Sequence, residues 1–315
     1  MDITHGVCFI QLSAKTKKSI LKVYKYRGDF KRDLKALKSN YFWAPDFNNL
    51  NDPCETTITS ETLKSQSKIL LPFFGKQNTK QFNEVFDLVE GVLAHSKRMG
   101  IYSLSKTFND ELLWAHYANS HKGFCIEYDL EALVKTYKSN NIYNFLVDYK
   151  KYPPSVDLND VIKAAKSNSL IKKMVGVKSQ RWKYEEEIRV ITDDFGEHVY
   201  DFDAVKSIYF GLRMPDEEKK ELIKTLRGRG INYFQIERIP NSYKFERKPI
   251  SDLYGSKVTY LSEFSISKSR HDIVNYRIIE KDYSKIYRKG TITIELDNKL
   301  HFEEIQTLCK IIKSD

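Results

Sequence analysis

Short β-forming segments are interspersed irregularly with amphipathic helical segments along this chain. Strand-like stretches at 19–26, 41–44, 101–106, 124–128, 181–192, 205–211 and 231–238 are separated by helical stretches at 31–37, 80–99, 157–173 and 215–227, and by a helix that begins at Asp110 with Asn109 as its cap. The pattern lacks regular β–α–β alternation. It therefore predicts an α+β fold with mixed or antiparallel sheets flanked by helices.

The pattern changes after Pro240. Residues 257–266, 276–280 and 291–296 are strand-like, and 302–312 has helical spacing. We therefore expect a main, candidate catalytic domain at 1–240 and a C-terminal accessory domain or extension at 241–315.

Composition excludes several classes of protein. Hydrophobic residues make up 41% of the 315 residues, which is enough for a core. No apolar run approaches the roughly 20 residues of a membrane span, and the N-terminus does not resemble a secretory signal. The four cysteines are scattered without a C-x-x-C pair, which favours reduced thiols. We expect a cytoplasmic protein that does not bind membranes.

The net charge of +10 is concentrated near the N-terminus, where residues 1–40 carry ten Lys or Arg against three Asp or Glu. Such a basic segment is compatible with contact to nucleic acid or to an anionic cofactor. A solvated, lysine-rich face is the alternative interpretation.

Several well-known catalytic motifs are missing. The sequence contains no G-x-x-x-x-G-K-[ST], G-x-G-x-x-G, H-E-x-x-H or G-x-S-x-G. This argues against a P-loop ATPase, a standard Rossmann dehydrogenase, a zincin and an α/β-hydrolase. We expect no metal site.

The strongest chemical signal is the segment Trp182–Ile191, W-K-Y-E-E-E-I-R-V-I. If it is a strand, alternation places Glu185 and Glu187 on one face, where Arg189 can pair with one of them. Paired carboxylates suit the stabilisation of a cationic transition state such as an oxocarbenium ion. An exposed salt-bridge ladder is the alternative.

Three other segments offer candidate binding residues. Alternation in the 101–106 strand places the hydroxyls of Ser103 and Ser105 on one face, which leaves room for a flat ligand. The following helix carries an aromatic and histidine face, and the first strand ends in a basic residue beside a glycine. The residues concerned are Trp114, His116, Tyr117, His121, Tyr26 and Arg27.

Together these segments resemble an uncharacterised bacterial family, the domain of unknown function 2971. The resemblance covers about residues 22–215 and rests on Y-K-Y-R at 24–27, N-D-P-C-E at 51–55, S-L-S at 103–105, L-W-A-H-Y at 113–117, H-K-G at 121–123 and W-K-Y-E-E-E-I-R at 182–189. The family commonly has Phe where this chain has Cys54. The family name implies no activity.

The order of a basic residue, a serine strand and a late E-x-E also resembles the R-S-E pattern of ADP-ribosyltransferases. That resemblance implies that Arg27 helps to bind NAD, that Ser103 and Ser105 shape the nicotinamide pocket, and that Glu187 is catalytic. It further implies that Glu185 orients the acceptor. The usual S-T-S reads S-L-S here, so its middle position departs from the pattern.

The resemblance thus implies an NAD-consuming enzyme with NAD as its substrate. It would cleave the nicotinamide–ribose bond and transfer ADP-ribose to protein, nucleic acid or water, in anti-phage defence or as a toxin. Two alternatives stay open. One is a nucleic-acid-binding effector or metal-dependent nuclease of a defence system. The other is a binding module without enzymatic activity.

Overall fold

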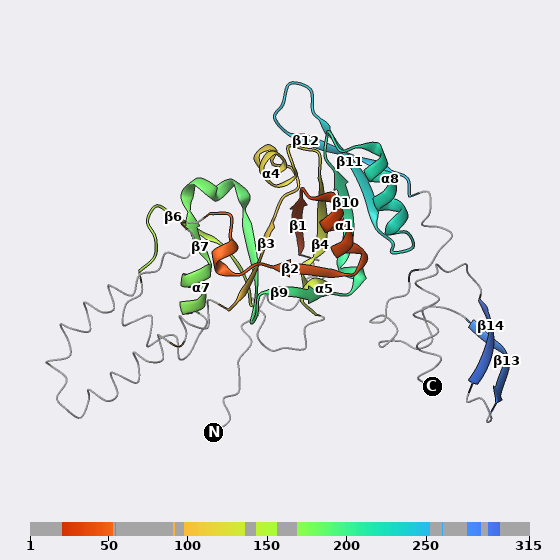
Figure 1. Ribbon diagram of the computed structural model, residues 1–315. Helices are drawn as coiled ribbons and strands as arrows, with labels where there is room; N and C mark the ends of the chain where they lie inside the picture. Colours follow the sequence, from red (N-terminus) through yellow and green to blue (C-terminus); the bar gives the residue numbers. More distant parts are fainter. Residues whose placement is uncertain are drawn as a thin grey trace, which may run out of the picture. The chain divides into compact units, whose positions relative to one another are not determined.

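A computed structural model describes residues 21–52, 54, 91, 98–135, 143–155, 169–252, 260, 276–284 and 289–296 (Figure 1). The fold is mixed α+β with a large, mostly antiparallel sheet and a few helices, which confirms the predicted fold class. The chain forms two compact units. Unit 1 comprises Met1–Lys25, Tyr41–Leu113 and Tyr137–Val199, and unit 2 comprises Tyr26–Asn40, Trp114–Thr136 and Tyr200–Asp315.

The main strands of unit 1 are hydrogen-bonded in the order β1-β3-β8-β5. They are β1 (Lys22–Arg27, whose last two residues belong to unit 2), β3 (Gly100–Ser105), β8 (Glu187–Thr192) and β5 (Tyr143–Leu146). Each neighbouring pair is antiparallel. All six residues of β8 are buried, so even its charged side chains lie inside the unit.

Two small sheets complete the described part of unit 1. β2 (Tyr41–Ala44) pairs with β9 (Gly196–Val199), and β6 (Asp148–Lys150) runs parallel to β7 (Val177–Ser179). Helix α7 (Ser169–Val175) precedes β7, and a 3-10 segment, η3 (Gln180–Glu185), follows it. A second 3-10 segment, η1 (Phe47–Asn49), follows β2. Figure 1 shows β6, β7 and α7 grouped together.

The main strands of unit 2 follow the order β12-β11-β10-β4. They are β4 (Phe124–Asp129), β10 (Val205–Phe210), β11 (Asn232–Arg238) and β12 (Phe245–Ile250). β10 and β11 are parallel because α8 (Asp216–Thr225) connects them as a crossover, whereas the other two pairs are antiparallel. The remaining elements are α1 (Phe30–Lys38), α5 (Leu130–Lys135), η4 (Phe202–Ala204) and the antiparallel pair β13 (Tyr276–Ser284) and β14 (Lys289–Leu296).

Side-chain caps account for the start of two helices. Asp29 accepts a hydrogen bond from the Arg32 backbone N–H at the start of α1. At α4 (Glu111–Tyr117), Asp110 accepts hydrogen bonds from the backbone N–H groups of Leu112 and Leu113. The cap of α4 is therefore Asp110, and the prediction of Asn109 was wrong by one residue.

Most predicted elements that lie in the described part are confirmed. They are the strands at 41–44, 101–106, 124–128, 205–211, 231–238, 276–280 and 291–296, and the helices at 31–37 and 215–227. The short strands β5, β6, β7, β9 and β12 were not predicted. Outside the described residues lie most of the helix expected at 80–99, most of the strand expected at 257–266 and the whole helix expected at 302–312. The helix expected at 157–173 is described only from residue 169, and its residues 169–173 belong to α7.

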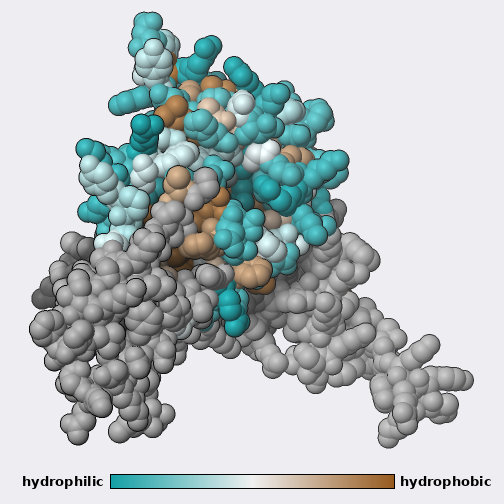
Figure 2. Space-filling model, turned by 60° about the vertical axis from the view of Figure 1, so that its left-hand side comes forward, coloured by the Kyte–Doolittle hydropathy of each residue, from teal (hydrophilic) through white to brown (hydrophobic). Residues whose placement is uncertain are grey.

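In the view of Figure 2, hydrophilic residues cover most of the described surface, and hydrophobic residues form a smaller area. Among the described residues, no helix combines the length and apolar character that a bilayer span requires. β12 pairs with β11, so residues 245–250 extend the sheet of unit 2. The expected domain boundary at residue 240 stays a prediction.

Candidate functional site

Two elements present the Glu185 and Glu187 side chains. The strand expected from Arg181 begins only at Glu187, because residues 180–185 form a 3-10 turn. Glu186 between them is left-handed, with φ 44°, and its backbone carbonyl accepts a hydrogen bond from Lys106 N–H. The strand prediction was therefore wrong in its first half, yet this turn also directs both carboxylates inward.

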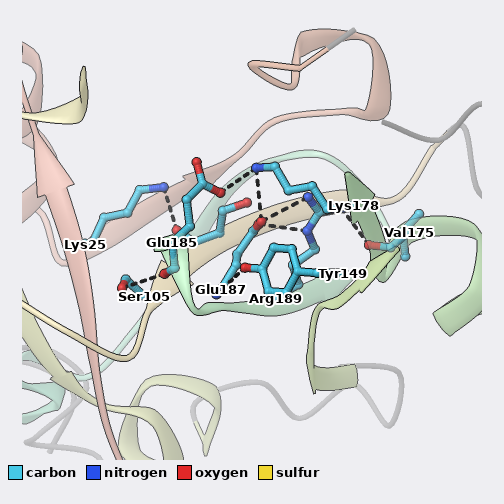
Figure 3. Close-up of polar contacts among 9 residues, drawn as sticks. Lys25, Ser105, Tyr149, Val175, Lys178, Glu185, Glu187 and Arg189 are labelled. Atoms are coloured by element: carbon cyan, nitrogen blue, oxygen red, sulfur yellow. Dashed lines mark hydrogen bonds and ion pairs between the residues drawn. The ribbon is translucent and has the colours of Figure 1, made fainter. Parts of the chain in front are cut away.

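The two carboxylates converge on one ammonium group, that of Lys178 on β7 (Figure 3). Lys178 Nζ lies 2.5 Å from Glu185 Oε2 and 3.3 Å from Glu187 Oε2. It also lies 4.9 Å from the centre of the Trp182 ring, within cation–π range. The side chains of Lys178, Glu185 and Glu187 are 4 to 6% exposed, so this contact is almost fully removed from solvent.

Arg189 binds Glu187 through two nitrogens, as the predicted alternation of β8 allowed. Its Nε lies 2.8 Å from Glu187 Oε1, and its Nη2 lies 3.2 Å from Oε2. Its Nη1 donates to the backbone carbonyl of Val175 at 2.7 Å. A planar guanidinium with these contacts fixes both the charge and the orientation of the carboxylate.

These cations control the ionisation of Glu187. Burial by itself would raise the pKa of this carboxyl. The charges of Arg189 and Lys178, with hydrogen bonds from Arg189 and Ser103, outweigh burial and lower the pKa to about 2. Glu187 is therefore a carboxylate at neutral pH.

The strand that carries Ser103 and Ser105, β3, lies beside β8 and therefore beside the same cluster. Ser103 and Ser105 on β3 are the register partners of Arg189 and Glu187 on β8. Ser105 Oγ donates to the Glu185 carbonyl at 2.8 Å and accepts from the Thr107 backbone N–H. Its hydroxyl thus fixes the backbone that carries Glu185.

Sequence reasoning missed two members of the cluster, Lys178 and Tyr149. The Tyr149 hydroxyl on β6 accepts a hydrogen bond from the Glu187 backbone N–H at 2.8 Å. Burial raises the pKa of Tyr149 to about 12, so the phenol stays neutral. Both residues reach the site through the short β6–β7 pair, which has no periodic signal in the sequence.

The contacts of Glu187 define what the cluster can do chemically. A carboxylate offers about four acceptor positions. Two contacts come from Arg189, one from Lys178 and one from Ser103. The carboxylate is charged, oriented and saturated, so a ligand hydroxyl must replace one of these contacts. The 3.3 Å contact with Lys178 is longer than both contacts with Arg189.

The other predicted binding residues belong to unit 2. Trp114 is fully buried, and Tyr26, 6% exposed, packs edge-on against it with 5.1 Å between ring centres. Arg27 lies 3.7 Å from the buried carboxylate of Asp33. His116 is exposed, with its ring centre 6.4 Å from that of Tyr117.

His121 ends an unusual turn in unit 2. Asn119, Ser120 and His121 all have positive φ angles, between 48° and 67°. The His121 ring lies between Trp114 and Phe245, and its buried Nδ1 has no hydrogen-bond partner among the described residues. Burial and the nearby Arg213 lower the pKa of His121, which favours the neutral imidazole.

Within the described residues, no group of three or more His, Cys, Asp or Glu side chains is arranged to hold a metal ion. Cys54 is exposed and Cys125 is buried, and neither forms a disulfide with another described residue.

A family model matches part of the chain. Residues 113–190 match the family described as "Protein of unknown function (DUF2971)", which confirms the predicted resemblance over this segment. The segment contains Tyr149, Lys178, Glu185, Glu187 and Arg189. No curated protein and no solved structure matches the chain.

Proposed function

We propose that this protein consumes NAD, cleaving the bond between nicotinamide and ribose and transferring ADP-ribose to a macromolecule or to water. One observation carries the proposal. Glu185 and Glu187 share the ammonium of Lys178, and Glu187 stays ionised although its side chain is only 4% exposed. A fixed negative charge of this kind stabilises a cation that develops beside it.

The chemistry needs such a charge at one step. When the glycosidic bond breaks, its electron pair leaves with the nicotinamide nitrogen, and positive charge develops on the ribose as an oxocarbenium ion. An acceptor oxygen or nitrogen then forms the new bond to ribose C1′ and loses a proton. In this proposal Glu187 stabilises the cation, and Glu185 orients the acceptor.

The arrangement sets a condition for binding. Because the Glu187 carboxylate is saturated, a ribose hydroxyl has to replace an existing contact, and Lys178 makes the 3.3 Å one. Arg189 would keep the carboxylate ionised after that exchange, since it binds both oxygens. The binding roles expected of Arg27, Tyr117 and His121 stay predictions, which nicotinamide release by Arg27→Gln, Tyr117→Ala and His121→Ala variants would test.

The test is nicotinamide release from NAD by the full chain, with water, DNA, RNA or cell lysate as acceptor. We expect Glu187→Gln to lower the rate at least 100-fold, because the stabilising charge is lost. Glu197→Gln makes the same charge change on an exposed residue of β9 and should release nicotinamide at the wild-type rate. NAD labelled in its adenine would then identify the acceptor.

Two results would overturn the proposal. One is the absence of nicotinamide release with every acceptor. The other is equal release by the wild type and by a folded Glu187→Gln variant. Metal-dependent cleavage of DNA or RNA that is insensitive to NAD would favour the nucleic-acid effector instead.

A further inference from the structure

We propose that Lys178 is a positioning residue of this site, whose ammonium holds Glu185 and Glu187 together as two charged carboxylates. The inference rests on the proposed function, because it assigns Lys178 a role in that reaction. It gives the lysine a task that differs from that of Arg189, which binds Glu187 from the same strand.

The geometry places Lys178 where three elements meet. Its side chain extends from β7, Glu185 ends η3, and Glu187 begins β8. The two contacts of Nζ, 2.5 Å and 3.3 Å, therefore fix the spacing of carboxylates that come from different elements. Figure 3 shows the ammonium group between both carboxylates.

A second link ties the same small sheet to Glu187. β6 pairs with β7, with Tyr149 as the register partner of Lys178. The Tyr149 hydroxyl accepts the backbone N–H of Glu187 at 2.8 Å. The β6–β7 pair thus contacts Glu187 at its backbone and at its side chain, which is the arrangement expected of a support for a catalytic group.

Lys178 and Arg189 are cations that contact the carboxylate pair, and Lys25 lies beside the cluster, where its Nζ donates to the Ser103 carbonyl at 2.7 Å (Figure 3). Glu185 and Glu187 contribute two negative charges, and Lys178 and Arg189 contribute two positive ones. The neutral phenols of Tyr149 and Tyr184 also face the cluster, and Asp110 acts on Tyr184 from the start of α4.

Loss of the ammonium has a specific chemical consequence. Without Lys178, the repulsion between the two buried carboxylates is less compensated, and one of them takes up a proton at a higher pH than in the wild type. The acid limb of nicotinamide release would move to a higher pH for the same reason, because the reaction needs the carboxylate charge. A lysine that merely supported folding would not produce this pH dependence.

The experiment compares Lys178→Met with Lys178→Arg, which keeps the charge. Lys172→Met is the matched control, because Lys172 pairs with Asp148 on β6 outside the cluster. Selective ¹³C labelling of glutamate carboxyls follows the titration of the pair from pH 2 to 8, and nicotinamide release is measured over the part of that range in which each protein stays folded. Signals are assigned with Glu185→Gln and Glu187→Gln variants.

We expect Lys178→Met to move a carboxyl titration of the pair, and the acid limb of nicotinamide release, upward by about one pH unit or more. Lys178→Arg and Lys172→Met should keep the wild-type titration. If Lys178→Met fails to fold, the double variant Lys178→Met/Glu185→Gln is compared with Glu185→Gln, and its Glu187 carboxyl should titrate at the higher pH of the two.

The outcomes separate the two proposals. A wild-type titration in folded Lys178→Met, or the same Glu187 titration in the double variant as in Glu185→Gln, overturns the role of Lys178. A wild type that releases no nicotinamide overturns the proposed function, whereas the carboxyl titration still decides whether Lys178 keeps both carboxylates charged.

Discussion

Acidification should destabilise the protein through Glu187 in particular. The pKa of this carboxyl is lowered from 4.5 to about 2 in the folded chain. A carboxyl whose pKa is lower in the folded chain than in the unfolded chain stabilises the fold at pH values above its unfolded-state pKa. This stabilisation is lost as the pH falls towards its folded-state pKa. The window for Glu187 therefore runs from about pH 5 down to about pH 2.

The size of the effect follows from the shift. A change from 4.5 to about 2, converted at 1.36 kcal/mol per pH unit, corresponds to about 3 kcal/mol of unfolding free energy. Glu187→Gln should be less stable than the wild type at pH 7 by about 3–5 kcal/mol, because Arg189, 1% exposed, loses its carboxylate partner. The difference between the two proteins should shrink as the pH approaches 2.

Urea unfolding followed by tryptophan fluorescence at several pH values from 7 to 2.5 measures this difference directly. Taking the difference between wild type and variant removes the contribution of the other carboxyls that titrate in the same window. A stability difference that stays constant over the whole range would refute the reasoning. It would mean that Glu187 is not held as a carboxylate by Arg189 and Lys178.

Three further predictions concern the backbone and its caps. Glu186→Gly should raise the free energy of unfolding by about 0.5–1 kcal/mol, since φ is 44° there, and a lower melting temperature would contradict this. Gly123→Ala should lower the free energy of unfolding, measured in urea, by about 2 kcal/mol or more, because the new Cβ would lie 1.9 Å from the Arg27 carbonyl oxygen. A urea midpoint equal to that of the wild type would show that the new Cβ meets no such obstruction. Arg229→Met should lower the free energy of unfolding by about 2–3 kcal/mol, because Arg229 donates to two carbonyls at the end of α1 and stacks on Tyr260. An unchanged thermal melt would disprove this role.

Local patterns predicted the strands and helices whose signals lie within one segment. The alternation of 101–106 and the helical spacing of 215–227 are examples. The strand expected from Arg181 was wrong before Glu187, because alternating residue types cannot reveal a 3-10 turn closed by a left-handed residue. The convergence of Glu185 and Glu187 was predicted, but the turn that brings it about was not.

The partners of the carboxylate pair were harder to predict than the pair itself. Lys178 lies seven residues before Glu185 and nine before Glu187, and because this stretch passes from β7 through a 3-10 turn into β8, no single periodicity relates the three residues. Tyr149 reaches the site through the pairing of β6 with β7, which is not local in the sequence. Such contacts follow from tertiary structure, and a single lysine or tyrosine in a short segment gives no signal of them.

The most direct test of the account is the initial rate of nicotinamide release from NAD at pH 7, compared between the wild type and Glu187→Gln. We expect measurable release by the wild type and a loss of at least 100-fold in a folded variant, because a stabilising charge is removed. Equal rates in the two proteins, or no release by the wild type with any acceptor, would contradict it.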